Sequence, residues 1–210
     1  LDWRRRQSFR VVLADTAWKG TENQGTGDDT VLGVVEIFAH QGRRDWVLLD
    51  AVVSREMVSD EGASELCRLA KKWSTPYMAP EMNSEKTIVG LIRMASRAHK
   101  IHPVIIELGG FSKKHKNDRI MSVAGGARSG AVWYLDTIKP EVVAVLKRQV
   151  EDHPQLEHED FLDMLANAWA SEILDKWCPL GIPMPEDDEP RTWVPMSRYT
   201  GLAMPTYGPH

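Results

Sequence analysis

Residues 9–15 read FRVVLAD, an apolar run with adjacent valines that ends on an acidic residue. Such a run is typical of a β-strand, and a strand here places the Asp15 carboxylate at the end of a rigid element. Two further apolar runs follow, TVLGVVEIFA at residues 30–39 and WVLLDAVV at residues 46–53. Short polar connections between three consecutive strands predict an antiparallel meander, with a glycine-rich loop after the first strand.

The spacing of apolar residues changes after the third run, from the pattern of strands to that of helices. Apolar residues at i, i+3, i+4 and i+7, such as Leu66, Leu69, Ala70 and Trp73, predict one-faced helices. The helices are expected before Pro76, from Ser84, from Pro140 and over residues 159–176, and the short strands at residues 77–81, 103–108 and 131–135. The alternation of strands and helices predicts a mixed α/β fold.

The composition excludes several classes of protein. The chain has 210 residues and is 42% hydrophobic, which suits one sizeable domain or two small ones. Its net charge of −4 excludes a uniformly basic nucleic-acid coat but allows a local basic groove. Two cysteines, Cys67 and Cys178, exclude a disulfide framework and fit a reducing cytoplasm. The apolar runs are too short for a membrane span, so we expect no membrane partner.

The two ends of the chain differ in character from its middle. Residues 1–176 are expected to form the folded domain, and residues 177–210 a proline-rich, extended or disordered tail. Seven of the twelve prolines lie in the final 35 residues, together with the acidic run at residues 186–189. Such a tail is either a solvated linker or a docking segment. The chain begins at Leu1 rather than Met, which suggests an excised fragment.

Four acidic residues are candidate catalytic and metal-ligating residues. Asp15 and Glu81 end predicted strands, and Asp160 and Asp163 are three residues apart, which places both on one helix face. Hydrolysis of a phosphodiester commonly uses two divalent ions, and carboxylate oxygens are the ligands that Mg²⁺ and Mn²⁺ prefer. From the residues alone, a second interpretation stays open, because acids also cap turns and stabilise helix starts.

A basic segment accompanies these acids. Residues 91–119 contain seven Lys and Arg residues against two acids, which suits a phosphate backbone that approaches a metal site. We expect a loop here to contact DNA through Lys113, Lys114, Lys116 and Arg119. The other three cations, on a predicted helix, either take part or form a solvated face; they are Arg93, Arg97 and Lys100.

The order of the acidic residues resembles a known family, the nuclease domain of the large terminase subunit of tailed double-stranded DNA bacteriophages. This family belongs to the RNase H-like, or retroviral integrase, superfamily. The resemblance covers roughly residues 9–175. Its motifs are VLADTA at residues 12–17, WVLLD at residues 46–50, Glu81-x-Asn83, HEDFLD at residues 158–163, and Lys116-x-x-Arg119. The family often has two adjacent Asp residues in the last acidic motif, where this chain has Glu159-Asp160.

The resemblance implies an RNase H-like mixed sheet, in which a three-strand antiparallel meander is joined by parallel strands and flanked by helices. It implies an endonuclease with two Mg²⁺ or Mn²⁺ ions on Asp15, Glu81, Asp160 and Asp163, which cuts double-stranded DNA during genome packaging. Lys116 and Arg119 would position phosphate.

The implied partners are the terminase ATPase domain, the portal protein and the small terminase subunit, in the host cytoplasm at the procapsid. No G-x-x-x-x-G-K-[ST] motif occurs, so the chain would be the nuclease half without its motor. A Holliday-junction resolvase of the same fold, or a non-catalytic DNA- or portal-binding module, remains an alternative.

Overall fold

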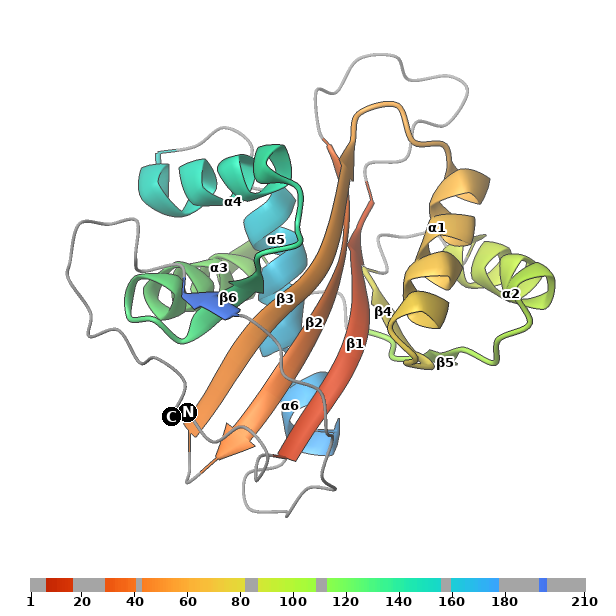
Figure 1. Ribbon diagram of the computed structural model, residues 1–210, viewed down its shortest axis with the longest axis horizontal. Coiled ribbons are helices and arrows are strands. Elements are labelled where there is room, and N and C mark those ends of the chain that lie inside the picture. Colours follow the sequence, from red (N-terminus) through yellow and green to blue (C-terminus); the bar gives the residue numbers. More distant parts are fainter. Residues whose placement is uncertain are drawn as a thin grey trace.

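One mixed β-sheet with helices on both sides forms the protein in its computed structural model (Figure 1). The structure describes residues 7–16, 29–40, 43–81, 87–108, 113–155, 160–177 and 193–195. Within these residues the sheet has seven strands in the order β5-β4-β1-β2-β3-β6-β7. The predicted α/β class, with helices flanking a mixed sheet, is confirmed.

The centre of the sheet is the predicted antiparallel meander, in which β2 pairs with both β1 and β3. Two strands extend it beyond β1 in parallel, β4 and then β5. On the other side, β6 pairs with β3 in parallel and β7 pairs with β6 in the opposite direction. The strands are β1 (Gln7–Asp15), β2 (Thr30–His40), β3 (Arg43–Ser54), β4 (Tyr77–Pro80), β5 (Val104–Ile105), β6 (Val132–Leu135) and β7 (Trp193–Pro195).

Helices lie on both sides of the strands, α1 and α2 on one side and α3, α4 and α5 on the other (Figure 1). Their bounds are α1 (Ser59–Lys72), α2 (Thr87–His99), α3 (Lys113–Arg128), α4 (Pro140–Asp152), α5 (Asp160–Ala166) and α6 (Ser171–Trp177). As predicted, α4 has a proline in its first turn, where the missing N–H costs nothing. No described helix is long and apolar enough to cross a bilayer.

Alternation along β1 and β2 decides which side chains face α5. Leu13 of β1 pairs with Gly33 of β2, and a Cβ atom built on Gly33 would lie only 2.6 Å from Cε of Met164. The missing side chain of Gly33 therefore lets α5 lie close to the sheet. Because side chains alternate between faces along a strand, Asp15 lies on the same face as Leu13, under α5.

The expected continuous helix over residues 159–176 is wrong. Helix α5 ends at Ala166, a short 3₁₀ turn covers Asn167–Trp169, and α6 begins at Ser171 after the extended residue Ala170. The break lets the ring of Trp169 stack on Trp46, with centroids 3.9 Å apart. Contact between the two rings offsets part of the cost of interrupting one helix.

The expected basic loop over residues 113–119 is also wrong, because these residues form the first turns of α3. The inner face of α3 has apolar residues at helical spacing, and this pattern is present in the sequence. The adjacent Gly125 and Gly126 are poor helix formers and make the pattern hard to recognise. The buried residues of this face are Ile120, Val123, Ala124 and Ala127. Lys116 and Arg119 therefore lie within a helix and not ahead of one.

Replacing Gly125 by alanine is expected to stabilise the protein by about 0.5–1 kcal/mol. Gly125 is exposed within α3, and a Cβ atom there meets nothing within 4 Å, so the change restricts only the unfolded chain. Gly33→Ala is the control with the opposite sign, because its Cβ would collide with Met164. Urea denaturation measures both, and a less stable Gly125→Ala protein would contradict the helical assignment.

The described part of the predicted tail is β7, which adds three residues to the sheet. The other residues of 177–210, Trp177 apart, lie outside the described residues. The boundary between domain and tail therefore stays a prediction.

Candidate active site at the ends of two parallel strands

Asp15 and Glu81 end two neighbouring strands at the same edge of the sheet. Strands β1 and β4 are parallel, with Leu13 opposite Ala79. The backbone N–H of Glu81 donates to the carbonyl oxygen of Ala14 at 3.0 Å, which continues the ladder past β4. Two residues beyond the Leu13–Ala79 pair, the alternation of side chains places Asp15 and Glu81 on the α5 face.

The position of Asp15 is rigid. It follows Val11, Val12, Leu13 and Ala14, all of which are 0% exposed, and it is itself only 9% exposed. Its strand lies between β2 and β4 and pairs with both. A carboxylate buried to this degree is costly unless a cation or hydrogen bonds compensate its charge.

Asp163 lies on α5, the helix that packs against the same face of the sheet. It is 9% exposed, and the next residue, Met164, lies against Gly33 of β2. Helix α5 is in contact with both β1 and β2. The three acids Asp15, Glu81 and Asp163 therefore come from β1, from the end of β4 and from a helix that covers them.

Arg119 adds a positive charge to this group. Burial lowers the pKa of its guanidinium, while the negative charges of Glu81 and Asp163, and of Glu172 on α6, raise it. One half-buried cation on α3 is therefore in electrostatic range of three carboxylates from three other segments. Glu172 is a residue that the sequence motifs missed, because its place depends on the break between α5 and α6.

Asp160 makes a contact that Asp163 does not. Its carboxylate accepts a hydrogen bond of 2.9 Å from the backbone N–H of Asp29, the residue before β2. Val31, two residues further on, is the partner of Asp15 in the sheet. Asp160 thus ties the first turn of α5 to the strand beside Asp15.

The start of α5 is held from a second side by Gln149 of α4. Its side-chain oxygen accepts the backbone N–H groups of Phe161 at 3.0 Å and Leu162 at 3.1 Å. These N–H groups belong to the first turn of α5, where a helix has no partners of its own for them. Gln149 is only 4% exposed, so it acts as a buried cap supplied by another helix. Sequence reasoning did not identify this residue.

The carboxylate oxygens of Asp15, Glu81 and Asp163 are hard ligands of the kind that Mg²⁺ and Mn²⁺ prefer. Within the described residues, no three or more His, Cys, Asp and Glu side chains form a group that could hold a metal ion as they stand. Asp15, Glu81 and Asp163 share one edge of the sheet without a closed cluster. The side chains of Lys113, Lys114 and Lys116 lie outside the described residues, and their contact with DNA stays a prediction.

Comparison with known proteins finds no matching family model and no matching curated protein. The solved structures that resemble the chain include the Fowlpox virus resolvase, in a complex with its substrate Holliday junction DNA. That likeness has a TM-score of 0.40 and 11% sequence identity, over 77% of this chain and 92% of the resolvase chain. At this level it assigns neither a residue nor an activity to the present chain.

Proposed function

We propose that this chain is a metal-dependent endonuclease that hydrolyses phosphodiester bonds of DNA. The observation that carries the proposal is the pairing of β1 with β4, which puts Asp15 and Glu81 side by side at one sheet edge. Asp163 lies on α5, which packs on the same strands. The negative charges of Glu81 and Asp163 act on the guanidinium of Arg119. Carboxylates on rigid elements at one edge of the sheet, with a nearby guanidinium, suit phosphoryl chemistry.

The residues fit Mg²⁺ or Mn²⁺. Asp15, Glu81 and Asp163 offer hard oxygen ligands, and two of the three are nearly buried, so they need positive charge nearby. Asp160 is a candidate for the same role by spacing, but its hydrogen bond to Asp29 supports a positioning role instead. Two bound ions would activate water and stabilise the attacking and leaving oxygens.

Arg119 is proposed to bind a non-bridging phosphate oxygen of the substrate. A guanidinium donates in a fixed planar fork that matches phosphate geometry. Glu81, Asp163 and Glu172 attract it toward the site, and the packing of α3 on α5 limits its movement. Its role is to orient the backbone and to neutralise charge while the carboxylates stay ionised.

The resemblance found in the sequence supports a finer proposal, that the substrate is double-stranded DNA cut during phage genome packaging. In that case the terminase ATPase domain, the portal protein and the small terminase subunit are the proposed partners, in the host cytoplasm. Preference for a four-way junction over linear duplex, measured on equal concentrations of the two substrates, would instead assign the chain to the junction resolvases.

Nicking of a supercoiled plasmid tests the activity. We expect nicking with Mn²⁺ or Mg²⁺, none with EDTA, and a rate lower by about 10²-fold or more in Asp163→Asn, since a carboxylate ligand becomes a neutral amide. Asp160→Asn keeps an oxygen that accepts from Asp29, so its rate should fall by less than about tenfold.

Mn²⁺ calorimetry on both variants separates ligand from positioning residue. Asp163→Asn should weaken Mn²⁺ binding, and Asp160→Asn should leave it nearly unchanged. A wild-type protein that nicks equally well in EDTA, or never nicks, would refute the proposed nuclease. Equal losses in the two variants would refute the division between Asp160 and Asp163.

A further inference from the structure

Helix α2 and the residue that follows it carry three exposed cations, Arg93, Arg97 and Lys100, which we call the basic ridge. A spacing of four residues brings Arg93 and Arg97 to the same helix face, and Lys100 follows the last helical residue, His99. Met94 lies among them and is 69% exposed, so neighbouring elements do not cover this side of α2. The ridge is therefore an open surface of the described structure.

The charges of the basic ridge are not compensated by nearby acids. Residues 87–106 contain no Asp or Glu, and the three side chains make no hydrogen bond or ion pair with the described residues. Arg93 and Arg97, four residues apart on the helix, repel one another. A bound polyanion would relieve this repulsion.

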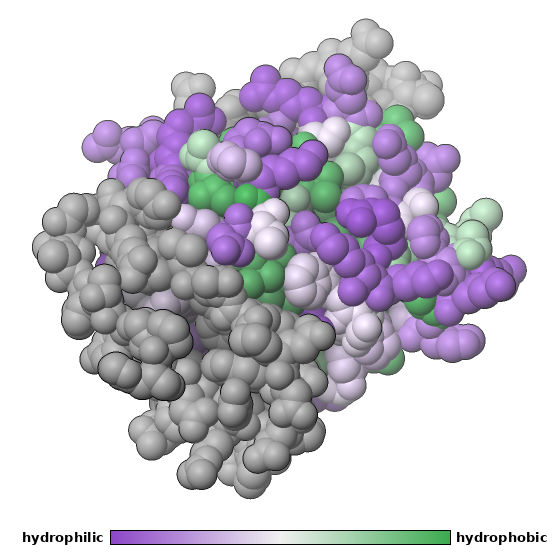
Figure 2. Space-filling view, viewed as in Figure 1, coloured by the Kyte–Doolittle hydropathy of each residue, from purple (hydrophilic) through white to green (hydrophobic). Residues whose placement is uncertain are grey.

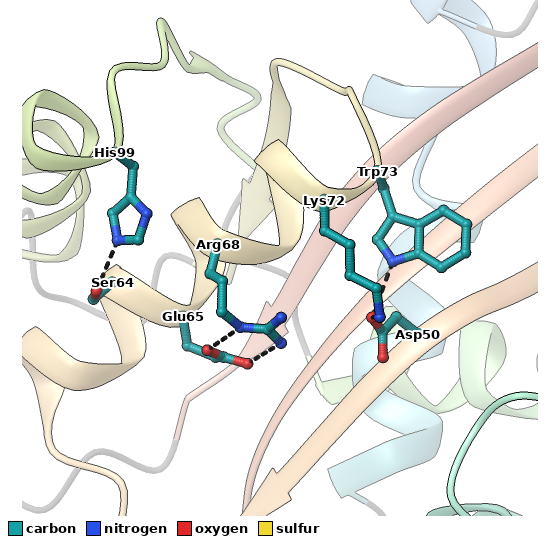
Figure 3. A network of polar contacts seen from close by, with 7 residues as sticks. All are labelled: Asp50, Ser64, Glu65, Arg68, Lys72, Trp73 and His99. Atoms are coloured by element: carbon teal, nitrogen blue, oxygen red, sulfur yellow. Dashed lines mark hydrogen bonds and ion pairs between the residues drawn. The ribbon is translucent and has the colours of Figure 1, made fainter.

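The neighbouring helix shows the contrast. On α1, Arg68 donates to Glu65 at 2.7 Å and Lys72 donates to Asp50 at 2.7 Å (Figure 3). His99, at the end of α2, forms a hydrogen bond of 2.9 Å with the hydroxyl of Ser64 on α1. Arg68 and Lys72 of α1 thus have carboxylate partners, whereas the side chains of the ridge have none among the residues that the structure describes.

The ridge lies further from the candidate active site than the start of α2 does. Helix α2 connects the parallel strands β4 and β5, so it starts near the edge that holds Glu81 and runs back along the sheet. Its first residue, Thr87, follows Glu81 by six positions, a reach of about 20 Å. In Figure 1, α2 is the outer helix beside α1, and in Figure 2 this side of the molecule is largely hydrophilic.

The end of the ridge is fixed by the backbone. Lys100 adopts a left-handed conformation with φ of 56°, and its N–H donates to the carbonyl oxygen of Arg97 at 3.3 Å. This geometry ends α2 and keeps Lys100 one turn beyond Arg97. The ridge from Arg93 to Lys100 then spans about 10 Å along the helix axis.

We propose that the basic ridge is a second contact surface for duplex DNA, on the side of the sheet opposite α5, which binds the phosphate backbone away from the cleavage point. The identity of the polyanion as DNA rests on the proposed function. A duplex carries a charge per about 1.7 Å of axis, so a 10 Å ridge faces several phosphates. No Phe, Trp or Tyr lies between Thr87 and Ile106, which favours backbone contact over base stacking.

The salt dependence of binding tests the proposal. Binding of a labelled linear duplex is measured in EDTA for the wild type and for Arg93→Gln/Arg97→Gln/Lys100→Asn; asparagine is chosen because it tolerates a positive φ. Each lost phosphate contact lowers the slope of log K against log salt by about 0.9. The triple variant should therefore lose up to about 2.7 from this slope, with weaker binding at low salt.

The matched control is Arg68→Gln/Lys72→Gln on α1, where both cations already have carboxylate partners. This double variant should keep the wild-type slope. An unchanged slope in the ridge variant, or an equal loss per charge in the control, would overturn the proposal. Binding to polyglutamate is measured in parallel for the same proteins. A ridge variant that still binds duplex as the wild type does but no longer binds polyglutamate would overturn the proposal in favour of an acidic protein partner.

Plasmid nicking with Mn²⁺ separates this proposal from the proposed function. If the wild type nicks DNA but the ridge variant binds duplex with the wild-type slope, the nuclease stands and the ridge fails. If the wild type binds duplex through the ridge and never nicks, the ridge stands and the nuclease fails. A wild type that binds no duplex overturns the ridge.

Discussion

Replacing Asp15 by asparagine is expected to abolish Mn²⁺-dependent cleavage, with a loss of at least about 10³-fold, or about 4 kcal/mol of transition-state stabilisation. The carboxylate follows four residues of β1 that are 0% exposed, Val11 to Ala14, so its position is set by a rigid element. The fold should remain intact. The midpoint of thermal unfolding should stay the same or rise, because like charges at the site are reduced.

The control for this prediction is Asp136→Asn, which makes the same chemical change at an exposed turn after β6. It should keep full activity and stability. The measurements are the nicking rate with Mn²⁺ and the thermal midpoint by circular dichroism. A folded Asp15→Asn protein that cleaves at the wild-type rate would remove Asp15 from the proposed site.

Replacing Gln149 by methionine is expected to cause the second largest effect, a loss of about 2–4 kcal/mol in the free energy of unfolding. Methionine has nearly the same volume but no oxygen to accept the N–H groups of Phe161 and Leu162. Both groups would be left buried without partners. Because Asp163 follows in the same helical turn, we also expect weaker Mn²⁺ binding.

Arg148→Met is the matched control, since it changes an exposed neighbour on the same helix to the same residue. It should change the free energy of unfolding by less than about 0.5 kcal/mol. Urea denaturation measures stability, and calorimetry with Mn²⁺ measures the site. Wild-type stability in Gln149→Met would show that the cap contributes nothing to the placement of α5.

The features that the sequence predicted well are those set by local patterns. Apolar runs of strand length gave the meander, and helical spacing gave α1 up to the region of Pro76. The positions of Asp15 and Glu81 at strand ends followed from where these apolar runs stop. Their adjacency was an expectation from a resemblance, and the parallel pairing of β1 with β4 supplies its structural basis.

The features that the sequence did not predict depend on packing between distant segments. Helix α5 ends at Ala166 because Trp169 finds a partner in Trp46, 123 positions earlier in the chain. Gln149 of α4 accepts backbone N–H groups at the start of α5. A helix is usually capped by the residue just before it, so the sequence around α5 does not point to Gln149. The helical state of Lys116 and Arg119 depends on an apolar face that becomes evident only further along α3.

The two outermost strands of the described sheet bear on how the protein behaves at high concentration. Strand β5 has two residues and β7 has three, whereas the long central strand β2 is paired with β1 and β3 along nearly its whole length. A long open strand offers backbone groups onto which another chain can polymerise. Within the described residues, the two outermost strands therefore offer a second molecule only two or three residues on which to add its own strand.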